Sequence, residues 1–212
     1  LMKVYLETYG CQMNEYDSEL IRSILTDQKY ELVQAKDGAQ IVLLNTCAIR
    51  ENAHQKIYHR LDELKGKKRR GEVQVVGVLG CMAQNLRKEL PSVAPVVDLV
   101  AGPDSYKRLP NMIQSALEKG DVGYDFSLSE FETYSDIAPK RLAGVNAWIA
   151  IMRGCDNFCT FCVVPYTRGR ERSRSPQSII DEAENIVAQG FKQITLLGQN
   201  VNSYEYEGSD FA

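Results

Sequence analysis

Three cysteines with close spacing are the residues of this chain most suited to chemistry. They are Cys155, Cys159 and Cys162, with three residues and then two residues between them. A stretch this short can point three thiolates at one centre, and thiolates suit soft metals and iron–sulfur clusters. Three protein ligands leave one position of such a centre open, where a substrate or cofactor can bind. The spacing therefore indicates a reactive centre rather than a structural support.

The other three cysteines are distant in the sequence, but each follows a predicted strand. Cys11 follows the strand-like residues 3–8, Cys47 follows residues 41–44 and Cys81 follows residues 73–79. In a parallel sheet the C-terminal ends of the strands meet at one edge, so we expect these thiols to converge. This predicts a second three-thiolate site. The alternative is three unrelated buried cysteines, which are common in protein cores.

Hydrophobic periodicity predicts strands that alternate with helices. Further strands are expected at residues 96–101, 147–152 and 193–197. A first helix is expected to start near Asn14 and Asp17, which resemble an N-terminal cap, and others at residues 51–65 and 105–117. The last helix should begin with Ser175 as its cap and Pro176 as its first residue, and end at Gly190. This alternation predicts an α/β fold with a parallel sheet.

The chain divides into two predicted units joined by a linker. Residues 1–120 form a parallel-sheet α/β domain, and residues 121–140, which are polar and aromatic without periodicity, form the linker. Residues 141–212 open with a strand, the cysteine loop, a helix and a strand, as at the start of a (β/α) barrel. Two strands cannot close a barrel, so we expect this second domain to be incomplete and the chain to be part of a longer protein.

Composition and charge narrow the class of protein. The 212 residues carry a net charge of −3, so nucleic-acid contact must depend on local patches. No apolar run reaches the ~18 residues that span a bilayer, and the first residues resemble a strand rather than a signal peptide. We therefore expect a cytoplasmic protein with no membrane contact and no disulfides. Zinc is disfavoured for the 155–162 loop because His54 and His59, on one predicted helix, offer no nearby fourth ligand.

The loop of residues 155–162, just after the first strand of a predicted barrel, is similar to the signature of the radical S-adenosylmethionine (SAM) enzymes. Other motifs resemble the amino-terminal domain of one family of these enzymes, the methylthiotransferases: Tyr9-Gly10-Cys11-Gln12-Met13-Asn14, Asn45-Thr46-Cys47 and Gly80-Cys81-Met82-Ala83-Gln84. Three stretches resemble the branch that modifies isopentenylated adenosine in tRNA (the MiaB type): Asn45-Thr46-Cys47-Ala48-Ile49-Arg50-Glu51, Val163-Val164-Pro165-Tyr166-Thr167-Arg168-Gly169-Arg170-Glu171 and Leu197-Gly198-Gln199-Asn200-Val201-Asn202. The resemblance covers essentially the whole chain.

The resemblance implies a 4Fe-4S cluster on Cys155, Cys159 and Cys162, whose open iron chelates SAM. Phe161 occupies the aromatic position that packs near the SAM adenine in this family. Electron transfer from the reduced cluster then cleaves SAM to methionine and a 5′-deoxyadenosyl radical. No catalytic residue beyond the cluster ligands is implied.

The resemblance further implies an auxiliary 4Fe-4S cluster on Cys11, Cys47 and Cys81, which carries the sulfur that is transferred. The implied product is a methylthio group on C2 of isopentenylated adenosine beside the anticodon. The implied partners are tRNA with this nucleoside and an electron donor such as flavodoxin or ferredoxin, with the protein as a monomer.

Two arginine- or lysine-rich stretches are candidates for RNA contact. The run at Arg168, Arg170, Arg172 and Arg174 could contact tRNA phosphates, form salt links between domains or be a solvated loop. For the second stretch, favourable interaction with a helix dipole is the simpler explanation; its members are Lys65, Lys67, Lys68, Arg69 and Arg70.

Two other functions stay open on the sequence alone. One is a methylthiotransferase that acts on threonylcarbamoyl-adenosine in tRNA or on a ribosomal-protein aspartate. The other, from a different class, is a non-catalytic metal or iron–sulfur binding module.

Overall fold

The computed structural model describes residues 1–48 and 51–211, without the side chains of residues 51–53. The first part of the chain forms a six-stranded sheet in the order β2-β1-β3-β4-β5-β6, and every pair of neighbouring strands is parallel. The strands are β1 (Lys3–Tyr9), β2 (Glu31–Val33), β3 (Ile41–Thr46), β4 (Val75–Gly80), β5 (Leu99–Ala101) and β6 (Gly123–Asp125). The predicted parallel α/β fold is confirmed.

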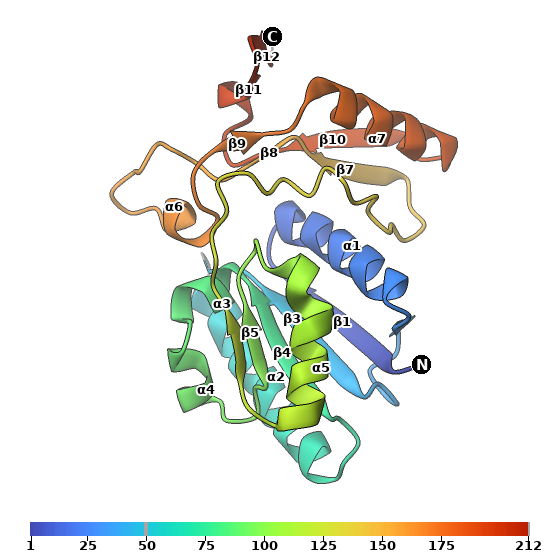
Figure 1. Cartoon of the computed structure of the whole chain (residues 1–212), viewed down its shortest axis with the longest axis vertical. Helices are drawn as coiled ribbons and strands as arrows, with labels where there is room; N and C mark the ends of the chain where they lie inside the picture. Colours follow the sequence, from blue (N-terminus) through green and yellow to red (C-terminus); the bar gives the residue numbers. More distant parts are fainter. Residues whose placement is uncertain (49–50, 212) are drawn as a thin grey trace.

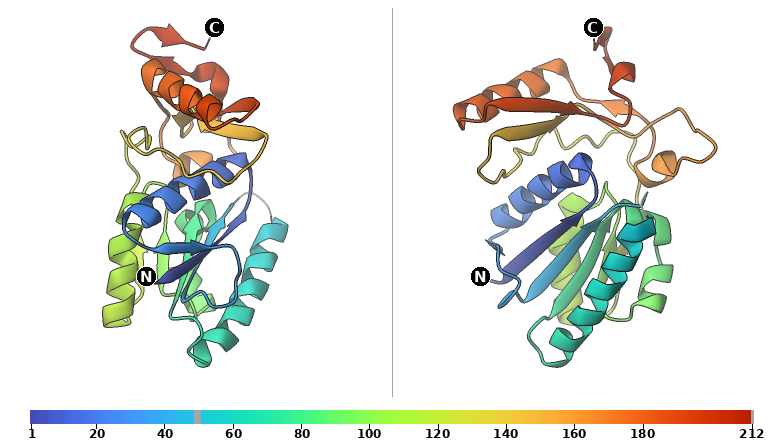
Figure 2. Two further views of the ribbon diagram at one scale, coloured as in Figure 1. Left: turned by 90° about the vertical axis from the view of Figure 1, so that its right-hand side faces the viewer. Right: turned by 180° about the vertical axis from the view of Figure 1, so that it is seen from behind.

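Helices cover both faces of this sheet (Figures 1 and 2). Helices α1 (Gln12–Asp27) and α5 (Leu109–Lys119) lie on one face, and α2 (Glu51–Arg69), α3 (Cys81–Leu86) and α4 (Glu89–Val93) lie on the other. Strands β3 and β4 are buried at every position, as expected for central strands covered on both faces. Successive residues of β3 face opposite sides: Ile41 and Leu43 pack under α1, and Val42 and Leu44 pack under α2.

The second part of the chain begins a separate layer. Strand β7 (Asn146–Ala150) pairs in parallel with β10 (Gln193–Leu197), and α7 (Pro176–Ala188) covers one face of the pair. Along the chain, three short elements lie between β7 and α7: β8 (Met152–Arg153), the helix α6 (Val164–Thr167) and β9 (Arg172–Ser173). Strand β9 pairs antiparallel with β8. The 3-10 turn η2 (Val201–Ser203) and the two-residue strands β11 (Glu205–Tyr206) and β12 (Ser209–Asp210) follow β10.

Helix α1 is shared by the two layers (Figures 1 and 2). One side packs on β1 and β3, and the other packs on the face of β7 and β10 opposite α7. Ala150 and Leu197 therefore belong to the same buried cluster as Leu20 of α1. Because both sides are covered, even polar residues of α1 such as Asp17 and Ser18 are fully buried.

The structure corrects several predicted boundaries. Helix α1 starts at Gln12 with Cys11 as its N-cap, so the cap predicted at Asn14 is wrong; Asn14 instead accepts a hydrogen bond from the Cys11 N–H at 3.3 Å. The helix predicted at residues 105–117 is divided into the 3-10 turn η1 (Tyr106–Arg108) and α5. Strand β2 and helices α3 and α4 were not expected, since each is too short to show a period. Ile49 and Arg50 of the quoted motif, and Ala212, lie outside the described residues.

The segment predicted as a linker is closely attached to the first unit. It begins with β6, the edge strand beside β5. Beyond β6, Tyr134 is fully buried, stacks on Tyr106 and donates its hydroxyl to the Pro103 carbonyl at 2.9 Å. The backbone N–H of Lys140 then donates to the Glu19 carbonyl of α1 at 3.0 Å. In the part of the chain that the structure describes, no helix is long and apolar enough to cross a membrane.

Candidate metal centres

The first three cysteines lie at one edge of the six-stranded sheet. Cys11 follows β1, Cys47 follows β3 and Cys81 is the first residue of α3 after β4. Strands β1, β3 and β4 are neighbours, and their parallel direction brings all three ends to the same edge. The three residues line one cavity of about 300 Å³.

Two asparagines fix the loops that carry these cysteines. The Asn14 amide donates to the Thr46 carbonyl at 3.2 Å, and the Asn45 amide donates to the Asn14 carbonyl at 2.8 Å. Gly80 has φ +88°, and a Cβ there would lie 2.5 Å from Asn45 Oδ1. The turn before Cys81 therefore requires glycine for its conformation and for the space beside Asn45.

The donor set suits a soft, multi-atom centre. All six cysteines are free thiols. Cys47 and Cys81 are each 5% exposed and Cys11 is exposed, and burial raises the pKa of the Cys81 thiol while Arg168 opposes that rise. Among the described residues no group of three or more His, Cys, Asp or Glu side chains is drawn together as a single metal ion would require. Three cysteines that line one cavity offer the type of donor, the thiolate, that holds iron–sulfur clusters.

The second unit supplies the opposite wall of this cavity. The wall residues lie on α6 and at the ends of α6 and β10: Val164, Thr167, Arg168, Leu197, Gly198 and Gln199. The cysteine-lined cavity is therefore an interface between the parallel-sheet unit and the unit that carries the 155–162 loop.

The second cysteine set lies on the loop between β8 and α6. The Cys155 N–H donates to the Gly169 carbonyl at 3.2 Å, and the Cys162 N–H donates to the Cys159 carbonyl at 2.9 Å. Gly154 has φ +79°, and a Cβ there would lie 2.0 Å from the Arg170 carbonyl oxygen, so no other residue fits without moving the backbone.

Exposure differs along this loop. Cys155 is buried, Cys162 is half-buried and Cys159 is exposed. Phe161 is 94% exposed, so its side chain is free to contact a ligand beside the loop. The ligand roles of the six cysteines and of Phe161 stay predictions.

The basic run, for which the sequence left RNA contact, salt links between domains and a solvated loop open, is mostly buried. Arg168 pairs with Asp17 at 2.9 Å, Arg172 with Asp104 at 2.6 Å and Arg174 with Glu182 at 2.5 Å; each of these arginines is under 8% exposed. The first two pairs join the second unit to the first. They are therefore the salt links between domains that the sequence offered as one alternative for this run.

Arg170 is the exception in the run. Its side chain is 62% exposed, its Nε lies 3.1 Å from Asp156 Oδ1, and its guanidinium lies over the Phe158 ring at 5.1 Å. Of the four arginines, this one is free enough to meet an RNA phosphate.

Sequence reasoning missed the acidic residue at the centre of the interface. Asp17 is fully buried on α1 and accepts from Arg153 at 2.8 Å, from Arg168 at 2.9 Å and from the Tyr106 hydroxyl at 3.3 Å. Arg153 also lies over the Tyr134 ring at 5.0 Å. The available signal was Asp17 itself, an acidic residue among the apolar positions of a predicted helix.

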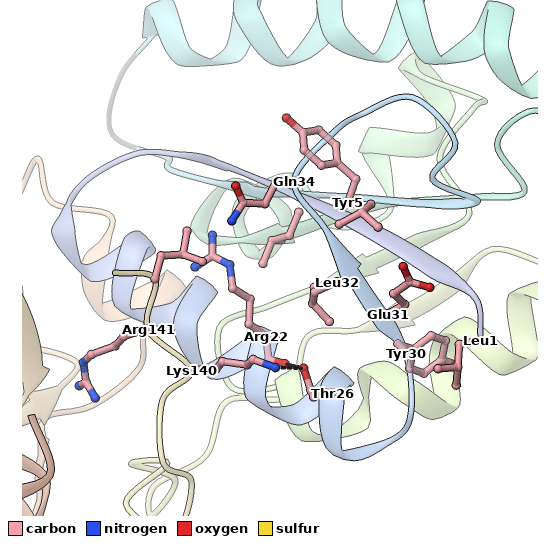
Figure 3. Close-up of a pocket in the computed structure, with 13 residues that line it drawn as sticks. Leu1, Tyr5, Arg22, Thr26, Tyr30, Glu31, Leu32, Gln34, Lys140 and Arg141 are labelled. Carbon is pink, nitrogen blue, oxygen red and sulfur yellow. Dashed lines mark hydrogen bonds between the residues drawn. The ribbon is translucent and has the colours of Figure 1, made fainter. Parts of the chain in front are cut away.

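Two other features lie away from the cysteines. A cavity of about 700 Å³ lies between α1, β2 and residues 140–142, where Lys140 donates to the Thr26 hydroxyl at 3.3 Å (Figure 3). In the lysine- and arginine-rich end of α2, Lys67 pairs with Asp37 at 2.6 Å and Lys68 pairs with Asp98. None of the six cysteines lines the larger cavity.

Comparison with known proteins agrees with the division into two units. Residues 3–102 match a family described as "Uncharacterized protein family UPF0004", and residues 149–212 match the radical SAM superfamily. The chain is 53% identical over 212 residues to a protein of Prosthecochloris aestuarii, covering 99% of this chain and 48% of that protein. It is also 53% identical over 212 residues to a protein of Chloroherpeton thalassium, covering 99% of this chain and 47% of that protein. Both relatives are named tRNA-2-methylthio-N(6)-dimethylallyladenosine synthase.

Solved structures confirm the arrangement of the fold. The radical SAM methyltransferase TsrM from Kitasatospora setae, solved with cobalamin and a [4Fe-4S] cluster, matches with a TM-score of 0.61 at 14% identity, covering 95% of this chain and 48% of that one. This likeness concerns fold alone. The chain spans about half the length of the curated relatives it matches. With both family matches in chain order and about half of its residues identical to those relatives, the chain is similar over the length it spans to these tRNA-2-methylthio-N(6)-dimethylallyladenosine synthases.

Proposed function

We propose that the protein to which this chain belongs adds a methylthio group to C2 of N6-dimethylallyl (isopentenylated) adenosine in tRNA. The observation that carries the proposal is the shared cavity: Cys11, Cys47 and Cys81 line it together with residues of the unit that carries the 155–162 loop, although the cysteines of that loop are not in its lining. A sulfur-carrying centre and a radical-generating centre must act on the same substrate atom, so one cavity bounded by both units is what the reaction needs. The relatives' name supports this tRNA substrate over the other substrates of the family.

The residues present fit two clusters with different surroundings. Cys155, Cys159 and Cys162 would hold the cluster that binds SAM, and Phe161 would contact the SAM adenine. Cys11, Cys47 and Cys81 would hold the auxiliary cluster. When bound, the first cluster and SAM supply a carbon-centred radical, which reaches a ring carbon that acid–base chemistry does not activate.

The chain's own residues would position these groups. The hydrogen bond from the Cys155 N–H to Gly169 and the glycine at position 154 hold the 155–162 loop against residues 169–170. The asparagine pair Asn14 and Asn45 holds the loops before the auxiliary site. Arg170 is the candidate for contact with a tRNA phosphate. The proposal places the protein in the cytoplasm, as a monomer reduced by a flavodoxin or ferredoxin.

The decisive experiment compares nucleosides in tRNA from a strain that lacks the gene, with and without the full-length protein. The deletion should abolish the 2-methylthio derivative of isopentenylated adenosine and leave the unthiolated nucleoside to accumulate. Full-length protein should restore the product, and a Cys11→Ala variant should not. Loss of a different methylthio nucleoside, or of none, would overturn the proposal.

Metal content tests the two sites directly. After anaerobic reconstitution the full-length protein should hold about eight irons, from two clusters of four. Replacing Cys155, Cys159 and Cys162 by alanine should leave about four. Zinc in place of iron, or unchanged iron in this triple variant, would show that the 155–162 loop holds no cluster and would favour a binding module.

A further inference from the structure

The cavity around the first three cysteines has one charged residue in its described lining, and that residue belongs to the other unit. Arg168 is 4% exposed and follows α6. Its Nη2 donates to Asp17 Oδ2 at 2.9 Å. Its Nη1 is buried and has no hydrogen-bond partner among the described residues.

A buried, unpaired N–H on a charged group is costly, so its presence in a cavity wall calls for an explanation. The same wall holds a second buried polar atom without a partner in the described structure, the amide oxygen Oε1 of Gln199, which is an acceptor rather than a donor. Both atoms come from the second unit and lie on the same cavity as the thiols. Together they indicate that this wall is built to meet a polar ligand.

The charge of the opposite wall indicates which ligand. Thiolates of Cys11, Cys47 and Cys81 would place negative charge in this cavity, and Cys47 and Cys81 are nearly inaccessible to water, whereas Cys11 is exposed. Buried anions need a cation close by. A guanidinium can bind two partners in one plane, so Asp17 can hold one nitrogen while the other serves the cavity.

Arg153 also has buried nitrogens without a partner among the described residues, Nε and Nη1, so what singles out Arg168 is its place on the cysteine cavity rather than the spare nitrogen alone. Arg153 already joins the two units through the other oxygen of Asp17, at 2.8 Å, and does not line the cavity. Arg168 makes the same kind of bridge but lies on the cysteine cavity. The two arginines therefore differ in what they face rather than in how they bind Asp17.

We propose that Arg168 is the counter-charge of the three-cysteine centre, with Asp17 orienting its guanidinium and Nη1 donating to a sulfur anion held there. This inference rests on the auxiliary cluster of the proposed function. It makes Arg168 a positioning residue by which the radical SAM unit sets the electronic properties of a centre in the other unit.

The test measures the reduction potential of the auxiliary cluster alone. Full-length protein with Cys155, Cys159 and Cys162 changed to alanine is reconstituted with iron and sulfide, and its midpoint potential is determined by anaerobic titration with dithionite. Adding Arg168→Gln removes a positive charge and should disfavour reduction. At the potential that is the midpoint of the unchanged protein, we expect the ratio of reduced to oxidised cluster to be roughly tenfold lower. This corresponds to a midpoint potential that is lower by about 59 mV for one electron. Arg168→Lys should restore most of the shift.

Arg153→Gln is the matched control, because it removes the other bridge to Asp17 without changing the cavity wall. It should leave the potential unchanged. No shift in Arg168→Gln with about four irons bound, or an equal shift in Arg153→Gln, would overturn the inference. Loss of iron confined to Arg168→Gln, with iron kept in Arg168→Lys, would support it, and a loss shared with Arg153→Gln would overturn it.

A different failure concerns the proposed function. If protein with Arg168 intact binds no iron at Cys11, Cys47 and Cys81, the auxiliary cluster and this inference both fall. Failure to find the methylthio product in cells, with the potentials behaving as expected, would overturn the substrate and leave the role of Arg168 intact.

Discussion

Asp17→Asn should destabilise the fold more than any exposed charge change, because this carboxylate joins the two units. It is fully buried and neutralises two arginines, Arg153 and Arg168, at 2.8 and 2.9 Å. Asparagine keeps the size of the side chain but removes its charge. Both guanidinium groups would then stay buried without their main counter-ion.

The magnitude follows from the burial of all three groups. Removing one partner of a buried ion pair costs about 3–5 kcal/mol. Arg153 keeps its contact with the Tyr134 ring, but Arg168 has no second carboxylate partner among the described residues. We expect a loss near the upper end, about 5 kcal/mol. With a urea dependence of roughly 2–3 kcal/mol/M, the midpoint of unfolding should fall by about 2 M.

The assay is urea unfolding of the reduced, metal-free chain, followed by two probes. Far-UV circular dichroism reports the whole fold, and the fluorescence of Trp148, the single tryptophan, reports the β7 face that packs against α1. In the variant, the fluorescence transition should occur at a lower urea concentration than the circular dichroism transition. Asp136→Asn is the control, because its pair with Lys107 is exposed and worth under about 1 kcal/mol. A midpoint for Asp17→Asn within about 0.5 M of the wild type would refute the reasoning.

Two further predictions concern Glu19 and Gly154. Burial raises the pKa of Glu19 to about 7, although Arg141 partly offsets the rise. The folded state therefore holds a proton that the unfolded state has lost, so stability should fall between about pH 4.5 and 7 by up to about 3 kcal/mol. Glu19→Gln should reduce this fall in urea midpoints, and an unchanged pH profile would contradict it. Gly154→Ala should lose the iron of the 155–162 loop through the clash with the Arg170 carbonyl, whereas Gly190→Ala, also at positive φ but in open space, should keep it.

The sequence was sufficient to predict the sheet and the edge at which the first cysteines meet. The strands β1, β3 and β4 show their apolar runs clearly, and each run ends just before a cysteine. Parallel strands bring their ends to one edge whatever their order, so the prediction did not require knowing that β1, β3 and β4 are neighbours. The sequence cannot show how deeply each cysteine is buried. The structure shows that Cys11 is exposed, whereas Cys47 and Cys81 are buried.

The burial of the arginine run could not be predicted, because it depends on partners far away in the chain. Arg168 and Arg172 pair with Asp17 and Asp104, which lie 151 and 68 residues earlier. A local reading of alternating arginines favours a solvated or RNA-binding loop. Asp17 is recognised as a partner only when α1 is seen to pack on two sheets at once, and Asp104 only when the loop after β5 is seen beside the second unit.

That double packing has a consequence for how the two cysteine centres can move. Helix α1 carries Cys11 at its start and Asp17 one and a half turns later, and its sides contact both sheets. A hinge between the units would have to separate the buried apolar surface around Leu20 and break two buried ion pairs on Asp17. Such a rearrangement is far more costly than a loop movement. We therefore expect the two units to stay as one body, with substrate access controlled by segments outside α1.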